Sequence, residues 1–360
     1  MDDELNVTYI TLDGFIELHT YRFLYFVIMF IIYFLIICFN FTIVYLIWIH
    51  QNLHEPMYIF IAALLINSVL YSTNIYPKLL VDILSEKQII SYSACVFQAF
   101  MYYTLACSEF LLLAAMSYDR YVSICKPLQY STIMRKTIVS MFLVLSWIVP
   151  GCEIALSVIF NANIKLCNFT LRGIFCNNSI YKCQCLSSVV LSVYGVFVSL
   201  NISFFPMLFV LFTYTRILII SYRSCKSVRR KAAQTCLPHL LVLIGFSCFF
   251  IYDIVIVKLE SDFPKTARLI MTLQIILYHP LFNPLIYGLK MKEISKHLKG
   301  LLTPPSGFAP GGFSSHHWLI PAYLQPIMVH QGVYEDWGAA PLSLLATSSP
   351  LLPEHMYFEC

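Results

Sequence analysis

The sequence predicts an all-α membrane protein built as a bundle of seven transmembrane helices. Of its 360 residues, 59% are hydrophobic and only 12% are charged, whereas about 25% of the residues of an ordinary soluble domain are charged. The apolar residues form long, nearly uncharged blocks and not the short periodic stripes of a globular core. The lipid bilayer is therefore the solvent that this composition suits.

Seven tracts each supply the roughly 20 residues that a helix needs to cross a bilayer core. Only helices or closed barrels satisfy their backbone polar groups in hydrocarbon, and barrel strands would show alternating segments of about 10 residues. A single acid interrupts two of the tracts, Glu109 in the third and Glu153 in the fourth. The expected spans lie near residues 23–49, 57–80, 91–121, 137–160, 189–220, 232–257 and 267–289.

The segments around these spans complete the expected order of elements. Residues 1–22 are mixed and acidic, so we expect an extracellular segment without a cleavable signal peptide, and the first span directs insertion. Residues 23–302 would form the membrane domain, which ends in a short amphipathic helix at 290–302. Residues 303–360 are rich in Pro, Gly and Ser and contain no Lys or Arg, which is typical of a disordered tail.

The distribution of Lys and Arg predicts which side of the membrane each loop faces. An odd number of spans puts the termini on opposite sides, and of 23 basic residues nine fall on the N-terminal side and fourteen on the other. The fourteen include a tight cluster over Arg223–Lys231. Because basic loops stay in the cytoplasm, we expect the N-terminus to lie outside the plasma membrane. Three glycosylation acceptors fall on the same outer side: Asn6, Asn168 and Asn177.

The cysteines predict a cross-linked outer lid. Cys95 lies at the outer start of the third span, and Cys167, Cys176, Cys183 and Cys185 crowd the loop before the fifth. Outward-facing cysteines meet an oxidising compartment, where disulfides persist. The alternatives are zinc binding or scattered free thiols, but the Cys183-x-Cys185 spacing is poor for zinc.

Four stretches carry a family resemblance, and they occur in the expected order and places. The cytoplasmic end of the third span reads MSYDRYVSICKPLQY over residues 116–130, and the first inner loop reads LHEPMY over 53–58. KAAQTCLPHL enters the sixth span at 231–240, and NPLIY ends the seventh at 283–287. In these stretches the chain resembles the odorant-receptor family of rhodopsin-like G-protein-coupled receptors.

The resemblance extends from about the first span to Lys299. IYPK at residues 75–78 and LYHP at 277–280 are similar to fish odorant receptors in particular. The resemblance implies the seven-helix rhodopsin-like fold, a small odorant molecule as ligand, and a heterotrimeric G protein of the olfactory, stimulatory type that raises cyclic AMP.

The resemblance also implies how the inner end works. At rest the acid matching Asp119 holds the arginine matching Arg120, which turns toward the G protein on activation. Pro284 removes one backbone hydrogen bond and loosens the end of the seventh span, so that Tyr287 can swing inward. The residues expected to take part in coupling are Asp119, Arg120, Tyr121, Asn283, Pro284 and Tyr287.

Glu109 marks a further position, because an intramembrane carboxylate is by default a functional hypothesis. The resemblance implies a polar cluster that holds sodium between this acid and an aspartate of the second span. Ser68 occupies the aspartate position here, so a plain hydrogen-bonded core role for Glu109 stands beside sodium binding. We expect a buried polar cluster of Asn40, Ser68 and Glu109, and assign no metal or cofactor site.

By the family pattern Cys95 pairs with Cys176, and Cys167 pairs with Cys185. A Cys167–Cys183 pairing stays open as an alternative.

The resemblance places the ligand pocket in the outer half of the bundle. Tyr102 stands where receptors for amines carry an aspartate, so an amine bound in that manner is not expected. The residue types are aromatic and apolar with hydroxyl groups, which suits small, weakly polar ligands. The expected lining residues are Tyr102, Tyr103, Ala106, Cys107, Val198, Ile202, Phe250 and Tyr252.

Other functions fit the sequence less well. A transporter predicts internal repeats or several buried charges along a path, and the sequence shows no convincing repeat. No nucleic-acid partner is expected, and no metalloprotease, nucleophile-elbow or phosphate-loop motif predicts an enzyme. A rhodopsin-like receptor for a non-odorant metabolite remains the alternative within the same fold.

Overall fold

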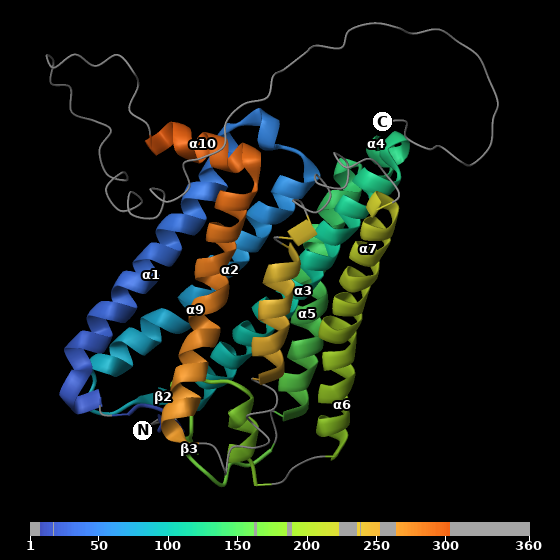
Figure 1. Cartoon of the computed structure of the whole chain (residues 1–360). Helices are drawn as coiled ribbons and strands as arrows, with labels where there is room; N and C mark the ends of the chain where they lie inside the picture. Colours follow the sequence, from blue (N-terminus) through green and yellow to red (C-terminus); the bar gives the residue numbers. More distant parts are fainter. Residues whose placement is uncertain are drawn as a thin grey trace, which may run out of the picture.

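The protein is a bundle of long helices with a small sheet at one end (Figure 1). The computed structural model describes residues 8–16, 18–161, 164–185, 189–222, 236–237, 239–252 and 264–302. The expected tail 303–360, the acceptor Asn6, the basic cluster Arg223–Lys231 and parts of the expected sixth span lie outside the described residues.

Within the described part of the chain, six helices are long and apolar enough to cross a bilayer, and His239–Tyr252 forms a shorter apolar helix. These seven helices confirm the expected fold class. A π-helical turn, η4 (Leu200–Phe204), joins α6 and α7 into one long helix. The bounds are α1 (Leu18–Ile49), α2 (Pro56–Leu84), α3 (Tyr92–Cys125), α5 (Lys136–Asn161), α6 (Val189–Ser199), α7 (Phe205–Tyr222) and α9 (Lys265–Lys290).

Two helices extend past the spans that hydropathy indicates. α1 begins at Leu18 and has non-helical backbone angles at Tyr21 (φ −117°, ψ 20°). α2 begins at Pro56, where the fixed φ of proline suits the first turn, and runs to Leu84. A helix satisfies its own backbone polar groups, so it can continue from hydrocarbon into the headgroup region.

α3 occupies the centre of the bundle. Of an 18-residue apolar stretch in each helix, 78% is buried in α3, compared with 22% in α1 and 11% in α5. The outward faces of α1 and α5 carry exposed large apolar side chains such as Phe34, Val144 and Ile148, which is the expected surface for contact with lipid tails.

A three-stranded sheet lies at the end of the bundle near the N-terminus (Figure 1). Its order is β2 (Ile89–Ser91), β1 (Tyr9–Leu12), β3 (Thr170–Leu171), with β1 antiparallel to β2 and parallel to β3. The N-terminal segment was expected only as a mixed extracellular stretch. Its strand alternates, and Ile10 and Leu12 turn inward onto a small core around Cys95 and Cys176.

The opposite end carries short elements. These are η1 (Gln51–Leu53), η2 (Pro127–Gln129), α4 (Tyr130–Ile133) and, after α9, the helix α10 (Lys292–Leu302). α10 is amphipathic and buries Ile294, while Asn52 Nδ2 and His297 Nε2 lie 3.2 Å apart. In Figure 1 it lies across the ends of the long helices.

Candidate functional site

Two of the residues expected to take part in coupling, Asp119 and Arg120, form an ion pair near the C-terminal end of α3. Arg120 donates to Asp119 Oδ2 from Nε at 2.9 Å and from Nη2 at 2.5 Å. Tyr130, from α4, donates its hydroxyl to Asp119 Oδ1 at 2.8 Å. Asp119 is fully buried, so its carboxylate depends on these three donors.

We call the three hydrogen-bonded residues Asp119, Arg120 and Tyr130 the inner lock. Burial, and then the nearby Asp119 carboxylate, raise the pKa of Tyr130 above its ordinary value. Its hydroxyl therefore keeps its proton and remains a donor to Asp119. Tyr121, the next residue of the motif, is half-buried.

A second polar cluster lies in the middle of the bundle. Glu109 Oε1 lies 3.0 Å from His279 Nδ1 and accepts from Asn283 Nδ2 at 3.0 Å. Asn283 Nδ2 also donates to Ser68 Oγ at 3.2 Å. In the tautomer that carries its proton on Nδ1, His279 is a second donor to Oε1. All four residues are buried, so the protein itself supplies the donors that this carboxyl group requires.

Asn40 lies outside that cluster and donates a hydrogen bond to a backbone carbonyl of α9 that Pro284 leaves without a donor. Pro284 has no N–H to donate to the carbonyl of Pro280, one turn earlier. Asn40 Nδ2 donates to this carbonyl at 2.7 Å and to the Ile36 carbonyl at 2.8 Å. Asn40 thus joins α1 to the proline-loosened part of α9.

Tyr287 and His239 form the contact between α9 and the helix His239–Tyr252. The Tyr287 hydroxyl lies 3.3 Å from His239 Nδ1, and both side chains are buried. Tyr214 of α7 lies parallel to the His239 ring at 6.4 Å between centroids. The three rings therefore join α7, α9 and the helix His239–Tyr252.

Two disulfides among the described residues lie at the end of the bundle that carries the sheet. Cys95 is bonded to Cys176, and Cys167 to Cys185, which are the pairs that the resemblance implied. Cys183 was the open alternative, and its buried thiol instead donates to the Thr170 carbonyl at 3.9 Å.

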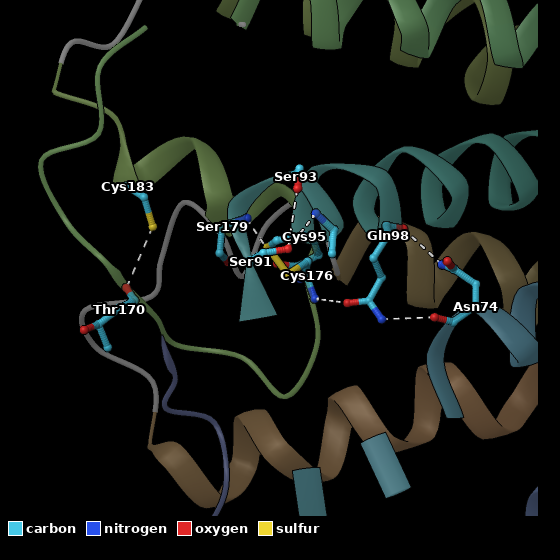
Figure 2. The surroundings of a disulfide bond; sticks show 11 residues. Asn74, Ser91, Ser93, Cys95, Gln98, Thr170, Cys176, Ser179 and Cys183 are labelled. Atoms are coloured by element: carbon cyan, nitrogen blue, oxygen red, sulfur yellow. Dashed lines mark hydrogen bonds between the residues drawn. A yellow bond between two sulfur atoms is a disulfide. The ribbon is translucent and has the colours of Figure 1, made fainter. Parts of the chain in front are cut away.

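A chain of hydrogen bonds ties the first disulfide to α2 (Figure 2). The Cys176 N–H donates to Gln98 Oε1 at 2.9 Å, and Gln98 Nε2 donates to the Asn74 carbonyl at 3.0 Å. Asn74 Nδ2 donates to the Gln98 carbonyl at 3.0 Å. Gln98 lies three residues after Cys95 and so on the same face of α3.

Replacing Cys95 by Ser should strongly reduce the amount of folded receptor. The bond closes a separation of 81 residues, and loss of a native disulfide typically costs about 2–5 kcal/mol. Surface labelling and a thermal unfolding curve would measure the loss. Cys152→Ser is the matched control, because Cys152 is exposed and outside the disulfides. Equal surface levels for the two variants would contradict a structural role of the bond.

The expected ligand residues divide into two groups. Cys107, Val198 and Ile202 form one buried cluster, which Phe250 and Tyr194 cover. Tyr102 belongs to a second group nearer α2 and the lid: its ring lies 5.3 Å from Tyr71 and 5.0 Å from Phe175. Ala106 is buried in the main core. Tyr103 is also buried, and its hydroxyl accepts from the Asn178 N–H at 3.1 Å. Tyr252 is half-buried.

A small apolar cavity lies elsewhere, between α1, α2 and α9. Met29, Leu79 and Leu273 are among its lining residues. None of the expected ligand residues lines it.

Aromatic rings connect the Cys107 cluster to the Glu109 cluster. Phe250 lies edge-on to Phe110 at 5.2 Å, and Phe110 lies 4.5 Å from Phe246. Phe246 in turn meets the His279 ring edge-on at 4.0 Å. Phe250, Phe110 and Phe246 therefore form a continuous row of packed rings between the Cys107 cluster and His279.

Sequence reasoning did not single out Tyr130 or His279 as site residues. His279 precedes Asn283 by four residues, and therefore lies on the same face of α9 one turn earlier. That spacing was the available signal. Asn67 and Trp147 were missed too: Trp147 Nε1 donates to Asn67 Oδ1 at 3.1 Å and joins α5 to α2.

These features together define a class of protein. Within the described residues, seven apolar helices, an ion-paired acid and arginine at one end and a cross-linked lid at the other are the architecture of a G-protein-coupled receptor, which is not an enzyme. The sequence matches the family described as olfactory receptor over residues 27–304. The chain belongs to the olfactory receptor family, which confirms the resemblance.

Individual relatives agree along most of their length. Olfactory receptor 2A5 of Homo sapiens is 36% identical over 273 residues, which cover 73% of this chain and 85% of that protein. Olfactory receptor 4E1 of Homo sapiens is 34% identical over 302 residues, 82% of this chain and 93% of that protein. Olfactory receptor 6B9 of Mus musculus is 31% identical over 304 residues, 83% of this chain and 95% of that protein.

Proposed function

We propose that this odorant receptor binds small odorants in the outer half of the bundle and activates a stimulatory heterotrimeric G protein that raises cyclic AMP. The inner lock carries the proposal. Its carboxylate is buried and holds Arg120 by two hydrogen bonds, while 12% of the Arg120 side chain is exposed at the end of the bundle. A pair that is strong yet lies at an interface can exchange partners when helices separate.

The proposed orientation puts the disulfide end outside and the inner lock in the cytoplasm of a cell with the receptor in its plasma membrane. The distribution of Lys and Arg supports this orientation, as do the disulfides, which persist in an oxidising compartment. Asn168 and Asn177 each accept from the backbone N–H two residues further on, at 3.0 and 3.1 Å. Asn168 is exposed and suits glycosylation, whereas Asn177 is half-buried and caps η3 (Asn178–Cys183). The resemblance to fish odorant receptors stays a prediction.

The proposed route of activation follows the aromatic contacts. A ligand among Cys107, Ile202 and Phe250 would shift Phe250, and Phe110 and Phe246 would pass this shift to His279. The Glu109 cluster and the Tyr287–His239 contact lie along α9 between this point and the inner lock. Each step is a change of packing between buried groups, which tend to have discrete arrangements.

A cyclic AMP assay tests the proposal. Cells expressing the full chain would be exposed to pooled volatile and water-soluble odorants, beside cells expressing Arg120→Ala. We expect a ligand-dependent rise in cyclic AMP of at least about 10-fold over the variant, because the variant lacks the group that meets the G protein. Silence of wild-type protein that has been shown to reach the surface would contradict the proposed odorant function.

A further inference from the structure

Two polar side chains border the Cys107 cluster, and the hydrogen bonds that they could make are incomplete within the described residues. Glu153 of α5 has a buried carboxyl oxygen, Oε2, with no hydrogen-bond partner in the described part of the chain. Ser203, in the π-helical turn η4, is only 7% exposed, and among the same residues the Cys107 thiol, a weak hydrogen-bonding group, is the partner of its Oγ. Buried polar groups are nearly always paired, so each exception needs an explanation.

Both groups lie beside the same thiol. Ser203 hydrogen-bonds the Cys107 thiol, and a negative charge on Glu153 would act on the same thiol. Cys107 is buried with Val198 and Ile202, and Ile154 and Tyr194 complete the wall. The Tyr194 hydroxyl donates to the Glu153 carbonyl oxygen at 2.9 Å, so this bond engages the backbone of α5 and not the buried carboxyl oxygen Oε2.

The π-helical turn explains why Ser203 faces this point. A π turn inserts one extra residue into the helix, and such turns are frequent at functional sites. Ser203 and Ile202 are both buried as a result. A polar and an apolar side chain from adjacent positions therefore border the same cluster.

We propose that Glu153 and Ser203 select small alkyl amines as ligands of this receptor. A buried carboxyl oxygen without a donor is unfavourable, and an ammonium group would supply donors to Glu153 Oε2 and Ser203 Oγ. The alkyl chain of the amine would lie against Val198, Ile202 and Phe250. The amine is held from α5, and not from Tyr102 on α3, where the sequence argued against an amine. This inference rests on the proposed odorant function.

The test compares ligands that share one carbon skeleton. Cells expressing the full chain would be given straight-chain primary amines of four to eight carbons and the corresponding alcohols, with cyclic AMP as the readout. Glu153→Gln should raise the half-maximal concentration of the amines by roughly 10- to 100-fold, and that of the alcohols by less than about 3-fold, because a hydrogen bond to a charged group is the one lost. Ser203→Ala should shift the amines by about 3- to 10-fold.

Controls separate this selection from folding and from coupling. Glu86→Gln makes the same change at an exposed acid outside the pocket and should alter nothing. Glu153→Asp keeps the charge and should restore part of the amine response. Equal loss of amine and alcohol responses in Glu153→Gln, or wild-type cells that answer other odorants but no amine, would overturn the inference and leave the proposed function standing. Silence to every odorant would overturn both.

Discussion

Replacing Asp119 by Asn should raise ligand-free cyclic AMP by about 10-fold. Arg120 donates twice to Asp119 Oδ2, at 2.9 and 2.5 Å, and the amide keeps the shape of the side chain but loses its charge. A hydrogen bond to a charged group contributes about 1.5–3 kcal/mol, which corresponds to at least about 10-fold in the balance of resting and active states. Basal cyclic AMP per receptor at the cell surface is the measurement.

Tyr130→Phe is the graded control for this experiment. It removes only the neutral donor to Oδ1, at 2.8 Å, so the basal signal should rise by less than in Asp119→Asn. If both variants stay at the wild-type level while remaining at the surface, the inner lock does not hold the resting state.

Replacing His279 by Ala should destabilise the receptor by about 3–5 kcal/mol. The change removes a hydrogen-bond partner of Glu109 Oε1, at 3.0 Å, and a buried carboxyl group that loses such a partner bears the cost of its desolvation. It also removes the ring that meets Phe246 at 4.0 Å. Thermal unfolding in detergent would show the loss directly.

A double-mutant cycle separates the electrostatic part from the packing part. In a Glu109→Gln background the carboxylate is gone, so His279→Ala should cost much less there than in the wild type. Equal costs in both backgrounds would mean that His279 acts only by packing, and the hydrogen bond to Glu109 would carry no net stabilisation.

The bundle was predictable because hydropathy is a local signal. Each span is recognisable in the sequence as about 20 consecutive apolar residues. The described part of the chain contains six long apolar helices and the shorter helix His239–Tyr252. The outer sheet was not predictable in the same way. Tyr9–Leu12 is four residues long and pairs with segments about 80 and 160 residues further along the chain, and pairing at such separation leaves no local signature.

The site residues that are adjacent in the sequence were predictable, and the contacts between residues far apart in the sequence were not. Asp119 and Arg120 are adjacent in sequence, and their motif identifies them. His279 and Glu109 lie 170 residues apart, and the sequence gives no sign of their 3.0 Å contact. Ser203 and Glu153 are harder still, because their importance lies in hydrogen bonds that are incomplete within the described residues, and only the packed structure reveals it.

Recruitment of a G protein without any odorant tests the central claim most directly. A luminescent energy-transfer pair would join the full-length receptor to a soluble, nucleotide-free form of a stimulatory G-protein α subunit. We expect strong ligand-free recruitment to Asp119→Asn and recruitment at background level to the double variant Asp119→Asn/Arg120→Ala, since Arg120 is then absent. Equal recruitment to the single and double variants, with both at the surface, would contradict the account of Arg120 as the group that Asp119 releases to the G protein.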